Sequence, residues 1–442
     1  MLLLHRGESL ISMPDINKKE AFKLAIREFH ERSLPDLVER ELSVPLDAEK
    51  VVTLYGPRRV GKTYYLYQLI DSLIPLHGKE RIIFINLEDE RLLPLDVKDM
   101  HLLVEAYYEL YPENRKKLAY LFLDEIQVVE GWETFVRRLD ESRNFRIFIT
   151  GSSARLMSRE IATSLRGRTL PYQLLPLSFS EFLRFKKLKY DLPLVKYSGI
   201  RFDIKKALEE YLEWGGYPEA ARADEDIRIE ILKSYFEMIV FRDLVERFSI
   251  RNSRFMKFLL KYLLTNISNL FSVNRFYCSL ESGLKSSRET LQDYLSHILE
   301  SEIIFLIPKF SYSLKVQGKN PKKIYCLDNG LRRTAAFLFS KDIGRLAENL
   351  VFLELLRRGY EVHYWKNKKE VDFIAQKEGR TLAINVCYED SIPERETEAL
   401  NVLKDSDLKT DALFLVTRDT DKELNNIRFV PLWQWLLSRD FF

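Results

Sequence analysis

The sequence predicts an α/β protein whose N-terminal half is built on a doubly wound parallel sheet. Three observations lead to this fold class. Short apolar runs alternate with helical stretches across residues 51–180, as strands joined by crossover helices do. One run leads directly into a glycine-rich phosphate-binding pattern at residues 56–63. Another, residues 120–123, is entirely apolar and ends at an acidic residue, which is typical of a strand buried on both faces.

Residues 1–50 form an N-terminal helical segment ahead of the sheet. The stretch Lys18–Arg32 predicts a helix because its apolar residues recur at helical spacing. They are Ala21, Phe22, Leu24, Ala25 and Phe29. We therefore expect this helix to carry its apolar residues on roughly one face.

A complete G-x-x-x-x-G-K-[ST] pattern follows the predicted strand Val51–Tyr55. The glycines let backbone N–H groups close around phosphate oxygens, Lys62 reaches the β- and γ-phosphates, and the Thr63 hydroxyl ligates Mg²⁺. We expect ATP or ADP to be held with Mg²⁺ by the loop and the first helical residue after it. These residues are Gly56, Pro57, Arg58, Arg59, Val60, Gly61, Lys62, Thr63 and Tyr64.

The acidic pair after the second apolar run predicts the catalytic centre. Asp124, at the carboxyl end of the strand, is expected to hold Mg²⁺ through water, as in P-loop NTPases generally. Glu125 is placed to polarise the attacking water, which favours an ATPase over a small GTPase. The alternative is a surface Asp-Glu pair that caps the next helix.

A third buried strand, Phe145–Thr150, leads into Ser152 and Ser153. One of these serines could touch the γ-phosphate or orient the attacking water, or it could cap the helix expected at residues 154–159. Asn86 ends another strand and could restrain Glu125 until a partner binds.

With these motifs in order, the sequence resembles archaeal and bacterial AAA+-type ATPases whose C-terminal region was long classed as a domain of unknown function. The resemblance extends from about Asp36 to about Glu389 and rests on the segments GPRRVGKT, LFLDEIQ, ITGSSARL, SLRGR and LLPLSFSEF. The first two are generic to P-loop proteins, and the last two are more particular to this family. The resemblance implies a Mg²⁺-dependent ATPase core over residues 51–180 that acts through conformational change. It does not identify the partner.

Two arginines of the SLRGR segment, Arg166 and Arg168, are candidate catalytic residues. An arginine delivered to the γ-phosphate stabilises the transferring phosphoryl group, and in ring or dimer ATPases a neighbouring subunit often supplies it. A homo-oligomer would allow contact in trans. Arg168 precedes a predicted strand, so it could equally pair with a local carboxylate.

A helical region at residues 181–248 is the place for an AAA+-like lid, and the turn Trp214–Pro218 interrupts it. Residues 249–339 then resemble a winged helix. We expect helices at residues 254–264, 268–272 and 286–299, the last capped by Ser286. A strand at residues 303–307, a basic loop at residues 315–323 and a return strand at residues 323–328 complete the expected wing.

Residues 286–323 are therefore a candidate DNA-binding surface. Polar groups of the third helix would face the major groove, and lysines of the wing would meet phosphates. The helix offers Ser287, Arg288, Gln292 and His297, and the wing offers Lys315, Lys319, Lys322 and Lys323. Winged helices also serve as protein-docking modules, so a protein partner is the alternative.

Residues 340–442 resemble the restriction-endonuclease-like fold. In that fold a helical Glu, a strand Asp and a Glu-x-Lys on the next strand hold Mg²⁺ and activate water. Glu348 and Asp372 match, but Asn385 and Cys387 stand at the Glu-x-Lys positions. A metal ligand and the water-activating cation are lost together. We therefore expect a nuclease fold that has lost catalysis and is kept for binding.

Composition sets the remaining limits. The 442 residues carry a net charge of +3, which does not by itself argue for nucleic acid. No apolar run approaches the roughly 18 residues that cross a membrane. Three scattered cysteines fit a reducing cytosol, so a cytoplasmic location is expected. Two functions remain: an ATP-driven switch acting on nucleic acid, or an ATP-dependent switch of the signalling or defence type that binds a protein.

Overall fold

The computed structural model describes residues 17–151, 165, 167–280, 286–335 and 343–438. The chain forms two compact units. The first comprises residues 1–37, 42–56 and 62–173, and the second comprises residues 38–41, 57–61 and 174–442. The division into five domains predicted from the sequence stays a prediction.

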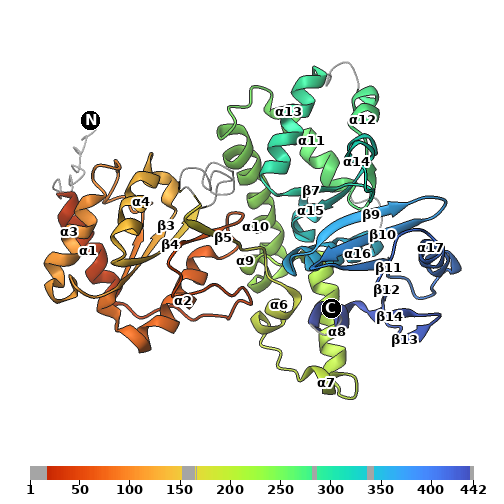
Figure 1. The fold of residues 1–442 in the computed structure, drawn as a ribbon, viewed down its shortest axis with the longest axis horizontal. Helices are drawn as coiled ribbons and strands as arrows, with labels where there is room; N and C mark the ends of the chain where they lie inside the picture. The colour runs from red at the N-terminus through yellow and green to blue at the C-terminus, as the bar shows by residue number, and fades with distance from the viewer. Residues whose placement is uncertain (1–16, 152–164, 166, 281–285, 336–342, 439–442) are drawn as a thin grey trace, which may run out of the picture. The chain divides into compact units, whose positions relative to one another are not determined.

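The first unit is a five-stranded parallel sheet with helices on both faces (Figure 1). The strand order is β2-β3-β4-β1-β5, which confirms the predicted α/β class and the doubly wound sheet. Its strands are β1 Val51–Tyr55, β2 Ile82–Asn86, β3 Ala119–Asp124, β4 Phe145–Gly151 and β5 Thr169–Gln173. Its described helices are α1 Lys18–Glu31, α2 Lys62–His77, α3 His101–Leu110 and α4 Trp132–Ser142.

Burial explains why the strands of this sheet are apolar throughout. All six residues of β3 are buried, because helices cover both faces of a parallel sheet. On one face α1, α3 and α4 pack against the sheet in a single core that includes Phe22, Tyr107 and Phe135. On the other face, Phe122 and Phe148 of neighbouring strands stack with ring centroids 4.6 Å apart.

The second unit begins with helices. They are α6 Phe179–Phe185, α7 Leu192–Val195, α8 Ile200–Trp214, α9 Pro218–Arg222 and α10 Glu225–Met238. The chain continues from α10 as a π-helical stretch over Ile239–Glu246. The predicted turn at Trp214–Pro218 separates α8 from α9, and Gly215 there has a φ of 73°, which glycine adopts without strain.

A small antiparallel sheet of order β6-β8-β7 follows, surrounded by helices. Its elements are α11 Ser253–Thr265, β6 Leu270–Phe271, α12 Val273–Ser279, α13 Arg288–Glu300, β7 Ile304–Ile307, α14 Leu314–Lys319, β8 Lys322–Cys326 and α15 Asn329–Ala335.

Three predictions of detail in this region were wrong. The helix expected at residues 268–272 is instead β6, with α12 following it. Ser287, not Ser286, caps α13 by accepting a hydrogen bond from the Thr290 backbone N–H. The basic segment expected to be a loop contains the short helix α14.

The C-terminal part is a six-stranded mixed sheet of order β13-β14-β12-β11-β10-β9 (blue in Figure 1). Its elements are α16 Ile343–Arg357, β9 Glu361–Lys366, β10 Glu370–Lys377, β11 Arg380–Cys387, α17 Glu394–Lys404, β12 Ala412–Thr417, β13 Lys422–Leu424, β14 Ile427–Pro431 and α18 Leu432–Leu437.

Two cores cover the faces of this sheet. The α16 core joins α16 and α18 to the sheet, and it also contains Phe179 and Phe182 of α6 and Tyr211 of α8. The α17 core packs α17 onto the opposite face, around Leu400 and Leu415. Helices α6 to α9 and the C-terminal sheet therefore share one hydrophobic core.

Within the part of the chain that the structure describes, no helix is both long enough and apolar enough to span a membrane.

Candidate nucleotide-binding and ATPase site

The phosphate loop lies between β1 and α2. Gly61 has a φ of 93°, a conformation that strains any residue with a Cβ atom. Helix α2 begins at Lys62, so the N–H groups of its first turn have no acceptor within the helix, and they can meet phosphate oxygens together with the positive end of the helix dipole. The Lys62 side chain is buried, and its Nζ atom donates a hydrogen bond to the Gly56 carbonyl oxygen at 3.1 Å. The lysine is thus held over the loop that it is expected to serve.

Two oxygen groups suited to Mg²⁺ meet beside this loop. The Thr63 hydroxyl donates to the Asp124 Oδ2 atom at 2.6 Å. A hydroxyl and a carboxylate are ligands that Mg²⁺ accepts in proteins, usually together with waters and substrate phosphates. Burial raises the pKa of Asp124, and hydrogen bonds from the Thr150 and Thr63 hydroxyls partly oppose that shift. Thr63 and Asp124 therefore fit the metal role predicted for them.

Thr150 is a site residue that the sequence reasoning missed. Strand β4 lies between β1 and β3, and its register places Thr150 opposite Leu54 of β1. The Thr150 hydroxyl donates to the Asp124 carboxylate and accepts a hydrogen bond from the Glu125 backbone N–H at 3.0 Å. One fully buried hydroxyl therefore positions both acidic residues. The available signal was its place at the end of the predicted strand, two residues before Ser152.

Glu125 lies in a left-handed conformation, with a φ of 54°. Its side chain accepts a hydrogen bond from the Gln127 amide and makes no capping bond to the following turn. The helix-capping alternative therefore has no support in the geometry. Asn86 does not hold Glu125 here, because its side-chain oxygen accepts from the Glu88 backbone N–H at 2.9 Å.

Ser152, Ser153 and Arg166 lie outside the described residues. Arg168 is described, and it lies at the opposite edge of the sheet from the phosphate loop. Val51 pairs with Thr169, which places Arg168 beside the amino end of β1, whereas the loop follows its carboxyl end. The Arg168 guanidinium pairs with Glu141 at 2.6 Å. This geometry does not bring Arg168 to the nucleotide of its own chain.

In the second unit, a buried arginine supports the middle of the phosphate loop. Arg40 donates from Nη1 to the Val60 carbonyl oxygen at 2.8 Å and from Nη2 to the Leu175 carbonyl oxygen at 2.7 Å. Its Nε atom lies 2.9 Å from a Glu181 oxygen, and both side chains are less than a tenth exposed. Glu181 also completes the capping box of α6 with Ser178. The SFSEF segment therefore anchors the arginine that contacts the loop.

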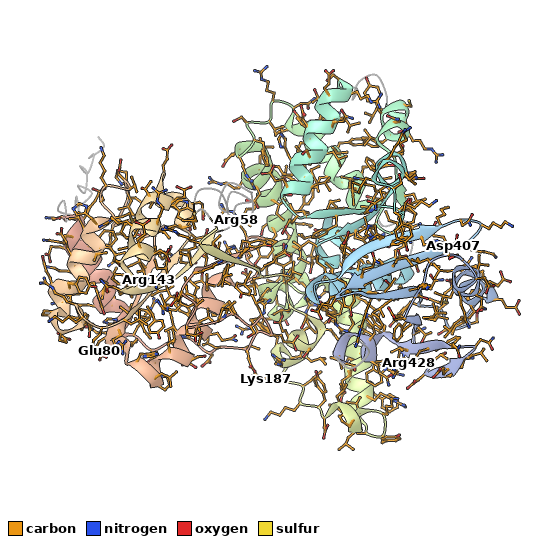
Figure 2. All side chains as sticks on the ribbon, viewed as in Figure 1. Arg58, Glu80, Arg143, Lys187, Asp407 and Arg428 are labelled. Carbon is orange, nitrogen blue, oxygen red and sulfur yellow. The ribbon has the colours of Figure 1, made fainter. Side chains whose placement is uncertain are left out.

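Arg58, labelled in Figure 2, also belongs to this loop. Its Nε atom lies 3.1 Å from an oxygen of Asp243, on the π-helical stretch, in the same unit. The phosphate-loop pattern predicted that Arg58 binds the nucleotide, and nothing in the sequence indicated this ion pair.

Fold and site together define the first unit as a P-loop nucleotide-binding domain of the AAA type. The family described as an AAA domain matches residues 48–183. Two families described as domains of unknown function, DUF8612 and DUF4143, match residues 205–342 and 343–435.

Relatives extend over almost the whole chain. An uncharacterised protein of Methanocaldococcus jannaschii is 40% identical over 421 residues, which cover 91% of each chain. An uncharacterised protein of Haemophilus influenzae is 34% identical over 398 residues, covering 89% of this chain and 95% of that protein. The chain belongs to the same family as these archaeal and bacterial proteins.

Solved structures align more loosely. The ORC2 protein of Aeropyrum pernix aligns over 76% of this chain and 92% of its own, at 12% identity and a TM-score of 0.39. Domain III of the replication initiation protein DnaA of Thermotoga maritima aligns over 51% and 94%, at 15% identity and a TM-score of 0.24. At such scores the functions of those proteins say nothing about this chain.

The candidate DNA-binding residues differ widely in accessibility. Ser287, Arg288 and Gln292 of α13 are exposed, as are Lys315 and Lys319. His297 stacks on Phe248 with ring centroids 4.0 Å apart, so the prediction that it lies on the exposed face was wrong.

Lys323 was also wrongly predicted to contact phosphate. It is 2% exposed, and its ammonium pairs with Glu348, Glu370 and Asp372. No nucleic acid can reach it in this conformation.

The C-terminal sheet places the residues of the altered nuclease pattern close together. Asn385 accepts a hydrogen bond from the Asp372 backbone N–H at 3.0 Å and donates to the Glu396 side chain at 3.2 Å. Burial raises the pKa of the Cys387 thiol to about 11, which keeps it neutral. Among the described residues, with Lys323 in its present position, no group of three His, Cys, Asp or Glu side chains is arranged to hold a metal ion.

Proposed function

We propose that this chain binds ATP with Mg²⁺, hydrolyses it, and acts as a molecular switch on nucleic acid through its C-terminal region. The observation that carries the ATPase proposal is the group Thr63, Asp124, Thr150 and Glu125 beside the phosphate loop. The AAA-domain match supports it independently of the geometry.

Each residue has a definable role in this proposal. Lys62 and the N–H groups at the start of α2 bind the phosphates, and Thr63 and Asp124 hold the metal. When bound, Mg²⁺ neutralises charge on the β- and γ-phosphate oxygens. Glu125 accepts a proton from the attacking water, once its side chain leaves Gln127. Arg166, from its own chain or a neighbouring copy, and Arg168, from a neighbouring copy in a homo-oligomer, would stabilise the transferring phosphoryl group.

Support for nucleic acid comes from exposed basic and polar groups within residues 286–322. Lys315 and Lys319 on α14 can meet phosphates, and Ser287, Arg288 and Gln292 are available on α13. The same face of α13 carries Glu289 and Asp293, which oppose phosphate binding there. The lysines of α14 are therefore the main candidates.

A partner protein is the second candidate, because two apolar side chains beside these lysines are strongly exposed. Tyr312 is 85% exposed and Leu314 is 81% exposed. Exposed apolar groups that lie together are typical of protein interaction sites.

We propose that the nuclease-like region binds without cleaving. It retains Glu348 and Asp372, but the Asn385 amide is bonded to backbone and Glu396, and the Cys387 thiol cannot replace the lost lysine.

The ATPase proposal is tested with Glu125→Gln. The amide cannot accept the water's proton, so we expect normal ATP affinity and turnover reduced by about 10²–10⁴-fold. ATP binding is measured by calorimetry and phosphate release by a coupled assay. Lys62→Ala is the comparison variant, since it should abolish tight binding as well. Wild-type turnover in Glu125→Gln would remove Glu125 from the catalytic role.

A further inference from the structure

Three carboxylates in the C-terminal region converge on a single buried ammonium group. The Lys323 Nζ atom lies 2.7 Å from an oxygen of Asp372, 3.0 Å from Glu348 and 3.2 Å from Glu370. The Lys323 side chain is 3% exposed, and the Glu348 and Asp372 side chains are 12% and 17% exposed. Carboxylate oxygens surround a bound divalent cation in a similar way.

The lysine and the acids come from different elements. Lys323 lies on β8 of the small antiparallel sheet, whereas Glu348 lies on α16 and Glu370 and Asp372 lie on β10. The ammonium is therefore delivered into the pocket from a neighbouring sheet. Through these ion pairs, the Lys323 side chain links the small antiparallel sheet to α16 and β10.

Other contacts hold the carboxylates in place independently of the lysine. The Tyr325 hydroxyl donates to the Glu348 Oε1 atom at 2.6 Å, and the Val386 backbone N–H donates to the Asp372 Oδ2 atom at 2.9 Å. Lys366 pairs with the second oxygen of Glu370 at 2.8 Å. These bonds preserve the pocket if the ammonium is removed.

Three acidic side chains and two lysines meet in this pocket. Burial alone would lower the pKa of Lys323, but the three carboxylates hold it above its ordinary value, so the ammonium stays charged. Burial, with the neighbouring charge of Asp372, raises the pKa of Glu348. The Lys323 ammonium opposes the repulsion between the Glu348 and Asp372 carboxylates.

We propose that the Lys323 ammonium is the resident cation of this pocket, and that it occupies the position where Glu348, Glu370 and Asp372 would otherwise bind a divalent cation. The ammonium lies within hydrogen-bond distance of all three acids, so a metal ion cannot enter while it is present. This proposal concerns the C-terminal sheet and does not depend on ATP hydrolysis. The ATPase proposal and this one can therefore fail independently of each other.

The proposal predicts that removing the ammonium creates a metal site. Lys323→Met keeps an unbranched apolar stem but lacks the charge. Ca²⁺ takes oxygen ligands at about 2.3–2.6 Å, a small contraction from the distances around Nζ. We expect nucleotide-free Lys323→Met to bind one Ca²⁺ at least tenfold more tightly than the wild-type chain. Tb³⁺, a luminescent probe for calcium sites, should bind there and be excited through Tyr325.

Two controls define the result. Lys322→Met changes the neighbouring lysine of the same strand and should behave as wild type. Lys323→Met with Asp372→Asn should lose the new site. Equal Ca²⁺ and Tb³⁺ binding by the wild-type chain would overturn the proposal, as would a folded Lys323→Met without binding. Should Lys323→Met not fold alone, Ca²⁺ should restore folding, and failure to do so would also overturn it.

Discussion

A single threonine hydroxyl connects the two acidic residues of the ATPase site. Thr150 Oγ1 bonds to the Asp124 carboxylate and to the Glu125 backbone N–H at once. Its β-branched side chain has few rotamers within a strand, so the hydroxyl is held with little loss of entropy. The left-handed backbone of Glu125 is held by the neighbouring strand at its N–H and by its own turn at its carbonyl oxygen, which accepts from the Val128 N–H.

Thr150→Val should therefore slow hydrolysis while leaving nucleotide binding almost intact. Valine keeps the shape but removes a hydrogen bond to a charged group, worth about 1.5–3 kcal/mol. We expect turnover to fall roughly 10- to 100-fold, measured as steady-state phosphate release, with ATP affinity within a few-fold of wild type.

The matched control is Thr53→Val on β1. Thr53 is also fully buried, and its hydroxyl bonds to Thr169 at 2.7 Å, away from the acids. Similar rates for both valine variants would show that Thr150 acts only in packing.

Some of these residues could be predicted from the sequence, and others could not. Lys62, Thr63, Asp124 and Glu125 follow from local patterns whose chemistry requires those residue types. Thr150 depends on strand register, and the position of Lys323 depends on how two sheets pack. No spacing along the chain encodes either contact. Lys323 lies in a basic stretch, and the sequence alone does not distinguish it from Lys319, which is exposed.

At the scale of elements, one buried ion pair joins the segment before β1 to the start of α6. Arg40 contacts the Val60 and Leu175 carbonyl oxygens, and Glu181 fixes its guanidinium from the first turn of the helix. Breaking a buried pair leaves an uncompensated charge, which costs about 3–5 kcal/mol. The pair therefore fixes the path of the chain more than it adds net stability.

Glu181→Gln should destabilise the second unit in a pH-dependent way. Burial by itself would raise the pKa of Glu181, but Arg40 and two backbone N–H groups bring it below the ordinary value of 4.5. A lowered folded-state pKa stabilises above the unfolded-state value and loses that contribution as pH falls through the folded-state value. The free-energy difference between wild type and variant should be full at pH 7 and shrink below about pH 4.5.

Urea unfolding followed from pH 3 to pH 7 measures this difference. Glu230→Gln, on the exposed pair with Lys233, should change stability by less than about 1 kcal/mol at any pH. A difference for Glu181→Gln that does not vary with pH would contradict an ionised Glu181 in the folded chain.

Some helices and strands were predicted correctly from the sequence, and others were not. Helix α1 and the strands at 51–55 and 120–124 carry strong periodicity or long apolar runs, and these predictions agree with the structure. The segment at 268–272 was misassigned because a two-residue strand gives no period to detect. Its pairing with β8 decides its conformation.

At the scale of the whole molecule, the choice between nucleic acid and protein depends on a short, exposed segment. The chain's net charge of +3 is too small to bind DNA non-specifically over its entire surface. Any binding must come from local groups, and the lysines of α14 stand beside Tyr312 and Leu314. The two partner classes therefore predict different responses to salt.

If nucleic acid is the partner, DNA affinity should fall steeply with salt and change with ATP. Lys315→Ala and Lys319→Ala should each reduce the slope of log affinity against log salt by about 1. Lys409→Ala, an exposed lysine on another part of the chain, is the control. Fluorescence anisotropy with and without ATP measures both effects. Binding that is absent or insensitive to salt would favour the protein partner, and then Leu314→Ser should weaken it.

Strand β10 contains one residue more than β9 in the stretch where the two strands pair. Between Val371 and Ile374 it advances three residues while β9 advances only two, from Trp365 to His363. The extra residue forms a β-bulge.

Asp372 lies within this bulge. Val371 and Ile374 face the α17 core, while Phe373 and Ala375 face the α16 core. A deletion of Asp372 alone would leave these four residues alternating between the two cores, as a regular strand does. Neither hydrophobic core depends on this position. The strand thus departs from regular geometry next to the Asp372 carboxylate that pairs with Lys323, and the irregularity serves the charged cluster rather than either hydrophobic core.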